Sequence, residues 1–173
     1  MFSSRFFVRL ILLSSLICLA ACGGSEAKHA VVLKSIEDRF AIKVGEHLVQ
    51  MQLAAEPAEM QKGLMFVPSM GADEGMLFIY ASPQQMNFWM HNTDLALDIG
   101  YFDASGELKE IYPMYPHDER TVASHGKNLQ FGLEMNQGWF KQAGIRPGAR
   151  LDLAAVAEGL RARGIKPESV GLR

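Results

Sequence analysis

The residues best suited to chemistry lie in one stretch of twelve, Asn87–Asp98, which reads NFWMHNTDLALD. Side-chain alternation predicts that residues 86–91, which cover the first part of this stretch, form a strand. The run 92–94 that follows is typical of a turn, because Asn, Thr and Asp side chains hydrogen-bond their own backbone. Polar groups gathered at the end of a strand are typical of binding sites and of structural turns alike. The candidate ligand-binding residues are Trp89, His91, Asn92, Thr93 and Asp98.

Acid–base catalysis is one interpretation of these groups. Asp94 and Asp98 with Glu74 could form a carboxylate pair, with His91 as the imidazole that transfers the proton in a hydrolase. The structural interpretation is that Asp98 accepts hydrogen bonds from backbone N–H groups beside the turn, and that Glu74 is a loop charge. The sequence has no Gly-x-Ser-x-Gly pattern for a serine nucleophile. We therefore favour the structural interpretation of the acids.

Metal binding has two candidate ligand sets. His91, His117 and His125 with Asp118 lack the close pairing of zinc motifs such as His-Glu-x-x-His. Thioethers suit Cu(I), so a methionine cluster could make a soft-metal carrier. Methionine also fills gaps in apolar cores, and aromatic residues share the same predicted strands, which favours a core. The methionines are Met51, Met60, Met65, Met70, Met76, Met86 and Met90. We expect no metal site and no cofactor.

The N-terminus indicates the compartment. It has basic residues at Arg5 and Arg9, then an apolar run over residues 10–21 that is too short to span a bilayer. This pattern predicts a secretory signal peptide over residues 1–21. The sequence Leu19-Ala20-Ala21-Cys22 resembles the bacterial lipobox, in which the cysteine becomes the acylated first residue of the mature protein.

Acylation of Cys22 would make the lipid bilayer a partner, because two or more acyl chains give stable anchoring. By resemblance to lipoproteins in general, Gly23 after the cysteine favours the outer membrane, with the protein facing the periplasm. Residues 22–30 read as the acylated cysteine and a short polar tether. The alternative is a secreted protein that is cleaved after Ala21 and keeps Cys22 free.

The amino-acid composition excludes several classes of function. Cys18 lies in the signal peptide and Cys22 at the lipid attachment point, so the folded domain has no cysteine for a disulfide or a thiolate nucleophile. Removal of two arginines with the signal peptide leaves fifteen basic and nineteen acidic side chains, a net charge of −4. This mildly acidic balance without basic clusters argues against nucleic acid as a partner.

Short apolar segments separated by turn residues predict the fold. We expect one mainly β domain over residues 31–154, a small and mostly antiparallel barrel or sandwich with short peripheral helices. Short helices are expected over residues 56–63 and 136–143, and residues 155–173 read as a peripheral tail. The loop over residues 113–127 is long enough to be a functional candidate. The expected strands are 31–36, 40–44, 47–53, 76–80, 86–91, 97–102, 108–112, 129–135 and 150–154.

An ordered set of motifs resembles the family called domain of unknown function 192. These motifs are Lys62–Phe66, Asp73–Phe78, Phe88–Thr93, Leu97-Asp98, Phe102-Asp103, Gly106, Glu134, Gly138–Phe140, Gly144-Ile145 and Gly148, and the similarity runs from about Val31 to Leu153. The resemblance implies a compact β-rich fold, commonly behind a signal peptide or lipobox, and no established activity. This chain departs from the family at His91, where relatives often carry lysine, and at Lys62, where arginine is expected.

Three functions follow as hypotheses. The favoured one is a membrane-anchored envelope module that binds a small ligand or an envelope protein, because no catalytic constellation is complete. The alternatives are an envelope hydrolase that uses Asp98, His91 and Glu74, and a copper carrier that uses the methionine cluster.

Overall fold

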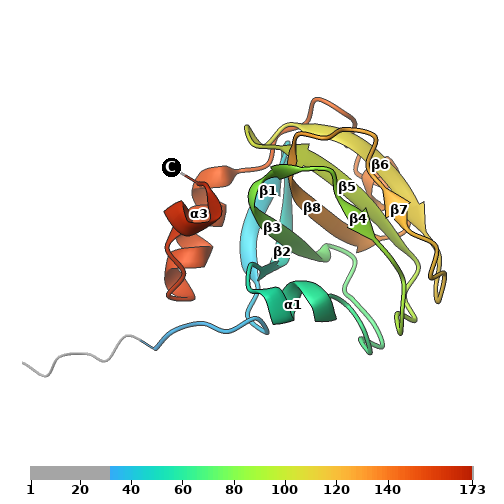
Figure 1. Cartoon of the computed structure of the whole chain (residues 1–173), viewed down its shortest axis with the longest axis horizontal. Helices are drawn as coiled ribbons and strands as arrows, with labels where there is room; N and C mark the ends of the chain where they lie inside the picture. The colour runs from blue at the N-terminus through green and yellow to red at the C-terminus, as the bar shows by residue number, and fades with distance from the viewer. Residues whose placement is uncertain (1–31, 173) are drawn as a thin grey trace, which may run out of the picture. The chain divides into compact units, whose positions relative to one another are not determined.

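The computed structural model describes residues 32–172, which form a six-stranded sheet, a two-stranded ribbon and short helices (Figure 1). The predicted signal peptide, Cys22 and the tether lie outside the described residues. The strands are β1 (Phe40–Val44), β2 (His47–Ala54), β3 (Glu74–Gln84), β4 (Asn87–Phe88), β5 (Leu97–Asp103), β6 (Leu108–Met114), β7 (Val122–Ala123) and β8 (Leu129–Asn136). The helices are α1 (Pro57–Lys62), α2 (Trp139–Gln142), α3 (Leu153–Ala162) and the 3₁₀ turn η1 (Pro167–Val170). None of these helices combines the length and hydrophobicity needed to cross a bilayer.

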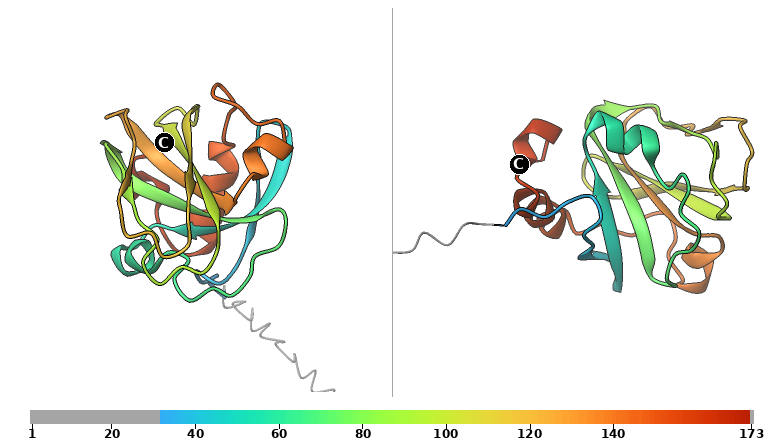
Figure 2. Two further views of the ribbon diagram at one scale, coloured as in Figure 1. Left: turned by 90° about the vertical axis from the view of Figure 1, so that its right-hand side faces the viewer. Right: turned by 90° about the horizontal axis from the view of Figure 1, so that it is seen from below.

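The strand order of the main sheet is β1-β2-β3-β8-β5-β6. Neighbouring strands are antiparallel except β2 and β3, which are parallel and joined through α1. The predicted mostly antiparallel, β-rich fold with short helices is therefore confirmed. The sheet is strongly curved (Figure 2), but its edge strands β1 and β6 do not pair with each other. Of the two predicted architectures, the barrel is wrong and a sandwich-like arrangement fits.

Both faces of the sheet are apolar. Successive side chains of a strand point to opposite faces, so a continuous apolar strand contributes to both. On β3, Leu77 and Ile79 belong to one core, whereas Met76 and Phe78 belong to the other. The first core includes residues of α2, α3 and η1, and we call that side the helix-covered face. The second is covered by residues of α1, of the loop after it and of the β4–β7 ribbon, and we call that side the loop-covered face.

Three segments differ from the sequence prediction. Residues 32–36 form no strand. The predicted strand over residues 86–91 is only two residues long and pairs with β7 outside the main sheet, because the chain turns again at His91. The predicted strand over residues 150–154 is reduced to isolated bridges, since Asp152 accepts a hydrogen bond from the Ala155 N–H (3.0 Å) and starts α3.

The segment predicted to be a peripheral tail contributes to the core. Val156 and Leu160 of α3 are fully buried in the helix-covered core, together with Val170 and Leu172. Apolar residues at positions 156 and 160 share one face of a helix, which explains why this short helix packs on the sheet.

Arg163, just after α3, ties this segment to α1. Its guanidinium donates hydrogen bonds to both carboxylate oxygens of Glu59 and to the Leu53 carbonyl oxygen. The side chains of Arg163 and Glu59 are 5% and 12% exposed. Burial opposes ionisation of Glu59, but the hydrogen bonds from Arg163 and from two backbone N–H groups outweigh it and lower the pKa of the carboxyl.

Replacing Arg163 with alanine should therefore lower the free energy of unfolding by about 3–5 kcal/mol, because it leaves the buried Glu59 carboxylate without its partner. Arg161 is exposed and has no such contact, so Arg161→Ala is a matched control that should change it by less than about 0.5 kcal/mol. Urea denaturation measures both, and equal effects of the two variants would contradict a stabilising role for Arg163.

Candidate functional site

A carboxyl group lies at the centre of the loop-covered face. Glu134 is on β8, an interior strand of the sheet, where it is in register with Met76 of β3 and Ile99 of β5. Its side chain is 4% exposed, and burial raises the pKa of the carboxyl to about 8. Among residues 32–172 no group donates a hydrogen bond to it or forms an ion pair with it. A buried polar group without a partner is costly, so it calls for an explanation.

Glu134 lines a small cavity of about 30 Å³, which we call the inner cavity. Its other buried walls are Leu64, Phe78, Phe88 and Thr93. Phe78 and Phe88 pack edge to face with ring centres 4.9 Å apart. Phe88 also covers Gly132, where a Cβ atom would lie 2.9 Å from its ring. Glycine at that position lets the aromatic ring approach the sheet beside Glu134.

A second and larger cavity of about 420 Å³ adjoins the inner one, and we call it the outer cavity. The two share the lining residues Gln61, Lys62, Met65 and Trp89. His91 and Asn92 complete one side of the outer cavity, and α1 supplies the other. We refer to the two cavities together as the cleft.

Trp89 stands at the junction of the two cavities. Its side chain is 49% exposed, although tryptophan usually buries more of its surface. The indole stacks on the His91 imidazole with ring centres 4.8 Å apart and an angle of 15° between planes. The His91 Nδ1 atom lies 2.7 Å from a carboxylate oxygen of Glu119, which holds the imidazole in place. The exposed indole face is therefore a fixed platform for a ligand.

The loops around the cleft contain the three non-glycine residues with left-handed backbone conformations in residues 32–172. They are Phe66, Asn92 and His117, with φ of 63°, 51° and 59°. The Phe66 N–H donates to the Asn92 carbonyl oxygen (2.9 Å), and the His117 N–H donates to the Thr93 carbonyl oxygen (3.3 Å). Such conformations are uncommon outside glycine and cluster at functional sites.

The long loop predicted over residues 113–127 supports the Trp89 segment from outside. The Asp118 carbonyl oxygen accepts a hydrogen bond from the Met90 N–H (3.1 Å). Ser124 accepts from the Met86 N–H through its hydroxyl (3.0 Å), and its own N–H donates to the Met86 carbonyl oxygen (2.9 Å). In the structure this loop lines neither cavity and instead positions the residues that do.

Four of the five predicted ligand-binding residues come together. Trp89, His91 and Asn92 line the outer cavity, and Thr93 and Trp89 line the inner one. Asp98 does not join them, because it projects with Gly100 towards Phe140 on the helix-covered face. One of its oxygens accepts a hydrogen bond from the Gly138 N–H (2.8 Å). Burial raises the pKa of Asp98, and that hydrogen bond partly offsets the effect.

The predicted hydrolase residues do not assemble. Glu74 accepts a hydrogen bond from the Gly71 N–H (3.0 Å) and pairs with Arg39 at 3.2 Å. His91 contacts Glu119, and Asp98 lies on the opposite face of the sheet. Glu74 was predicted to be a loop charge, whereas in the structure it is the first residue of β3. Asp98 accepts its hydrogen bond from the backbone.

The methionine cluster is divided between the two cores. Met51 is buried on the helix-covered face, and Met76, Met86 and Met90 are buried among aromatic rings on the loop-covered face. They fill the core, as the favoured sequence interpretation expected. Within residues 32–172 no three His, Cys, Asp or Glu side chains are grouped as a metal ion would require.

Sequence reasoning missed Glu134, which it recorded only as part of the family resemblance. In the β8 sequence LQFGLEM the acid alternates with apolar residues, a pattern typical of an exposed position. The available signal was in the neighbouring strand β3, whose sequence MLFIY is apolar at both parities, so both faces of the sheet are covered there. An acid on an interior strand of such a sheet must be buried.

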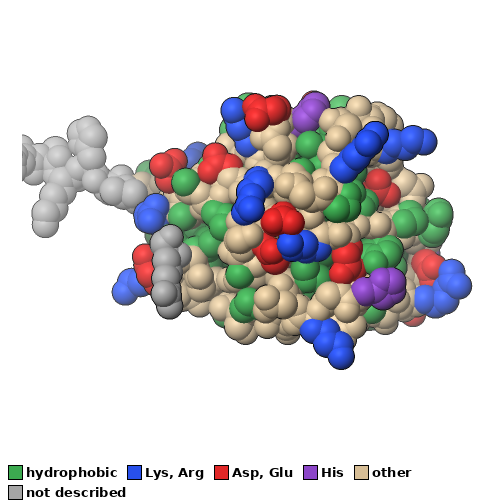
Figure 3. All heavy atoms as spheres, turned by 90° about the horizontal axis from the view of Figure 1, so that it is seen from above, with side chains coloured by type: hydrophobic (Ala, Val, Ile, Leu, Met, Phe, Trp, Pro, Cys, Tyr) green, Lys and Arg blue, Asp and Glu red, His purple; other side chains and the backbone are tan. Residues whose placement is uncertain are grey.

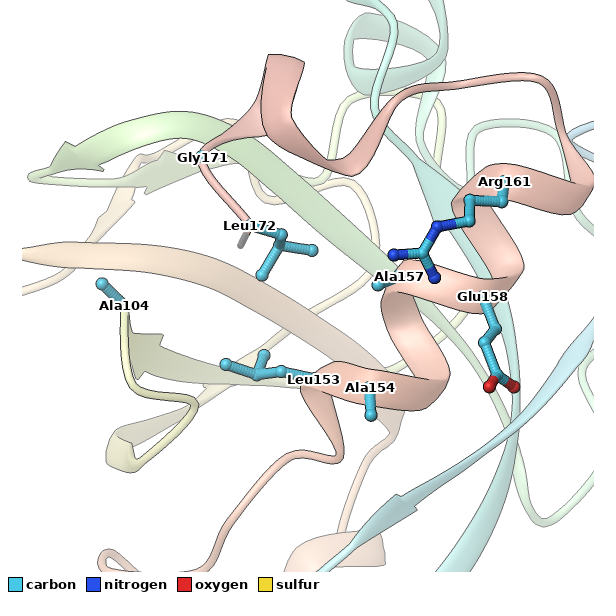
Figure 4. A pocket seen from close by; sticks show the side chains of 8 residues that line it. All are labelled: Ala104, Leu153, Ala154, Ala157, Glu158, Arg161, Gly171 and Leu172. Atoms are coloured by element: carbon cyan, nitrogen blue, oxygen red, sulfur yellow. The ribbon is translucent and has the colours of Figure 1, made fainter.

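In the other cavities the polar lining groups are exposed or hydrogen-bonded within the described residues. One of them, about 520 Å³, lies between α3, the residues after η1 and the β5–β6 turn (Figure 4). Leu153, Ala157 and Leu172 line it, and its charged residues Glu158 and Arg161 are exposed. Another cavity is bordered by Phe140, Ile145 and Asp98, whose carboxylate accepts the hydrogen bond from the Gly138 N–H. The cleft above Glu134 is therefore the candidate functional site.

The chain belongs to the family described as Uncharacterized ACR, domain of unknown function 192, whose model matches residues 40–153. This confirms the resemblance seen in the sequence motifs. A comparison with curated proteins found no significant match.

Two solved structures are similar to this chain. One is a protein of unknown function from Novosphingobium aromaticivorans DSM 12444, with 33% identity and a TM-score of 0.61 over 65% of this chain and 83% of that one. The other, from Sinorhizobium meliloti 1021, is provisionally titled a transcription regulator. It has 31% identity and a TM-score of 0.61 over 66% of this chain and 92% of that one.

The buried state of Glu134 predicts a pH-dependent stability. Its folded-state pKa of about 8 exceeds the ordinary value of 4.5, so between these values the folded protein holds a proton that the unfolded chain has lost. The free energy of unfolding should thus fall as pH rises through this window, by up to about 1.4 kcal/mol per pH unit.

Glu134→Gln removes this contribution, so the variant should gain stability relative to the parent protein between pH 4.5 and pH 8. Denaturant titrations at several pH values measure the difference. Glu46→Gln, which changes an exposed acid in the β1–β2 turn, is the matched control. A stability difference between Glu134→Gln and the parent protein that does not change with pH would contradict the raised pKa.

Proposed function

We propose that this protein is a small-ligand-binding module whose ligand occupies the cleft above Glu134. The observation that carries the proposal is the carboxyl group of Glu134, a residue only 4% exposed, which borders a cavity and has no hydrogen-bond partner among residues 32–172. Replacing such a group with a hydrocarbon side chain would usually stabilise the fold. Its presence is accounted for if a ligand supplies the missing partner, and strongly perturbed carboxyl groups in clefts are typical of functional sites.

The surroundings of Glu134 support the same proposal. The strained residues Phe66 and Asn92 are hydrogen-bonded to each other beside the outer cavity. Strain of about 1–3 kcal/mol per residue persists only where neighbouring contacts enforce it, and binding sites are a common place for it. Trp89 offers an exposed aromatic face next to the buried carboxyl, so the cleft combines an apolar platform with one polar anchor.

A protein partner is the second candidate. Phe66, Trp89 and Tyr115 are 70%, 49% and 56% exposed. Phe66 is hydrogen-bonded to Asn92, and Tyr115 lies in the loop that supports the Trp89 segment. Exposed aromatic residues near a cavity are typical anchors of protein interfaces. An envelope protein that inserts a side chain into the cleft would contact both the exposed aromatic residues and the cavity.

We place the module in the cell envelope, anchored in the outer membrane through acylated Cys22 and facing the periplasm. This rests on the lipobox-like sequence before Cys22 and on the polar tether after it. We do not extend the transcription-regulator title of the Sinorhizobium protein to this chain, because its mature net charge is −4. On the face in Figure 3, acidic and basic side chains are interspersed, unlike the basic stripe of a nucleic-acid-binding surface.

Binding in the cleft should appear as thermal stabilisation by members of a panel of small metabolites. A ligand at a hundred times its Kd adds about 2.7 kcal/mol to the free energy of unfolding. Trp89→Ala should abolish the stabilisation, whereas Tyr115→Ala, an exposed aromatic residue outside both cavities, should retain it. Compounds that stabilise Trp89→Ala as well as the parent protein would show that the ligand site lies elsewhere.

Acylation is tested separately. Cells that express the full-length chain and grow with labelled palmitate should incorporate label into the protein, and the protein should fractionate with the outer membrane. Cys22→Ser should remove the label and release the protein from the membrane. Label that persists in Cys22→Ser, or a parent protein without label, would contradict the lipoprotein assignment.

A further inference from the structure

We propose that the inner cavity binds a primary ammonium group at the end of an unbranched carbon chain. The inference deepens the function proposed above and rests on it, because it names the class of ligand that the cleft takes.

The buried wall of the inner cavity has two polar side chains, Glu134 and Thr93, and both can accept hydrogen bonds from a ligand. Glu134 can accept hydrogen bonds at both carboxyl oxygens once it is ionised. Thr93 is 5% exposed, and its hydroxyl donates its proton to the His91 carbonyl oxygen (3.1 Å), so the hydroxyl lone pairs remain to accept. Phe78 and Phe88 add aromatic rings, whose faces are negative and attract cations. An ammonium group supplies three donors and a positive charge, which complements this set of groups.

The size of the inner cavity selects among cations. A volume of about 30 Å³ has room for one or two water-sized groups. A primary ammonium has one non-hydrogen atom and fits this space. A trimethylammonium or a guanidinium group has four, so either would need the walls to move apart.

The outer cavity accommodates the rest of such a ligand. Met65 and Trp89 line both cavities and provide apolar surface along the path from the inner cavity to solvent. Lys62 also lines both, and its side chain is exposed at the end of α1. As a cation next to the site, Lys62 must turn towards solvent when an ammonium enters.

A bound ammonium group would also give the Glu134 carboxyl a partner of opposite charge. The titratable groups that face Glu134 are Lys62 from α1, Tyr80 from β3 and Tyr101 from β5. Burial raises the pKa of both tyrosines, so they stay neutral near pH 7, and Lys62 is the one cation among the three. Without ligand, burial keeps the Glu134 carboxyl protonated at neutral pH. An ammonium beside it favours the carboxylate, so binding should release about one proton per ligand.

Isothermal titration calorimetry of the full-length protein in detergent micelles tests the proposal with n-butylamine as the probe. At pH 7, in buffers of different ionisation enthalpy, we expect one site and the release of about one proton. n-Butanol has the same chain and a neutral end, and it should bind at least about tenfold more weakly. Nα-acetyl-lysine amide should also bind if the natural source of the ammonium is a lysine side chain, and butylamine alone should bind if the source is a free amine.

Substitutions at the inner cavity test whether butylamine binds beside Glu134. Glu134→Gln keeps the shape of the side chain and should weaken butylamine binding by about ten- to a hundredfold, with loss of the proton release. Lys62→Met removes the competing cation and should strengthen binding. Glu46→Gln changes an exposed acid in the β1–β2 turn, outside both cavities, and is the control, with little effect expected.

The outcomes separate this inference from the function that it rests on. Butanol that binds as tightly as butylamine, or amine binding that survives Glu134→Gln, would overturn the ammonium assignment and leave a cleft for neutral ligands. If neither probe binds and no panel compound depends on Trp89, both the assignment and the proposed ligand-binding function fail.

Discussion

The main constraint on this structure is that both faces of its six-stranded sheet are apolar and must be covered. The helix-covered face is closed by α2, α3 and η1, which pack regular surfaces against the strands. The loop-covered face is closed by a short helix, a two-residue ribbon and irregular loops. Irregular segments fill space less completely than a helix face does, and a cleft remains between α1 and the Trp89 segment.

Glu134 gives that cleft its chemical character. An ionised carboxylate in an apolar site would cost several kcal/mol, so the group stays protonated and its pKa rises to about 8. The fold holds the site open at a cost in stability, through the buried acid and through left-handed residues in the surrounding loops. The same strained loops fix the Trp89 indole, so the rigid platform and the cleft have a common origin.

Much of the fold could be predicted from the sequence. Alternating apolar residues located six of the strands, and the proline and acids of residues 56–63 located α1, where Glu56 and Glu59 form the capping arrangement. Sequence patterns failed where tertiary packing decides. Residues 86–91 alternate like a strand, yet most of that segment covers the sheet as a loop. The C-terminal segment read as a tail because its helix is short, and it is held by burial of Val156 and Leu160.

The candidate site was predicted in part. Trp89, His91, Asn92 and Thr93 are neighbours in sequence, so one local pattern found them all. Asp98 was predicted to join these residues, but its position in β5 points its side chain to the opposite face of the sheet. The face on which a strand residue lies after a turn cannot be derived from the sequence alone. Glu134 is forty-one positions from Thr93 in the chain, and only the pairing of β8 with β3 and β5 brings them to one cavity. Long-range pairing of this kind leaves no local signal.

The central claim is that the Glu134 carboxyl group is neutral at pH 7 and has no hydrogen-bond partner among residues 32–172. The most direct test is a carbon-13 NMR titration of protein labelled at the glutamate carboxyl carbons, with Glu134→Gln used to assign the resonance. A titration midpoint near pH 8 is the result that this account predicts. A midpoint near the ordinary value of 4.5 would show that Glu134 is solvated or paired, and would contradict the account.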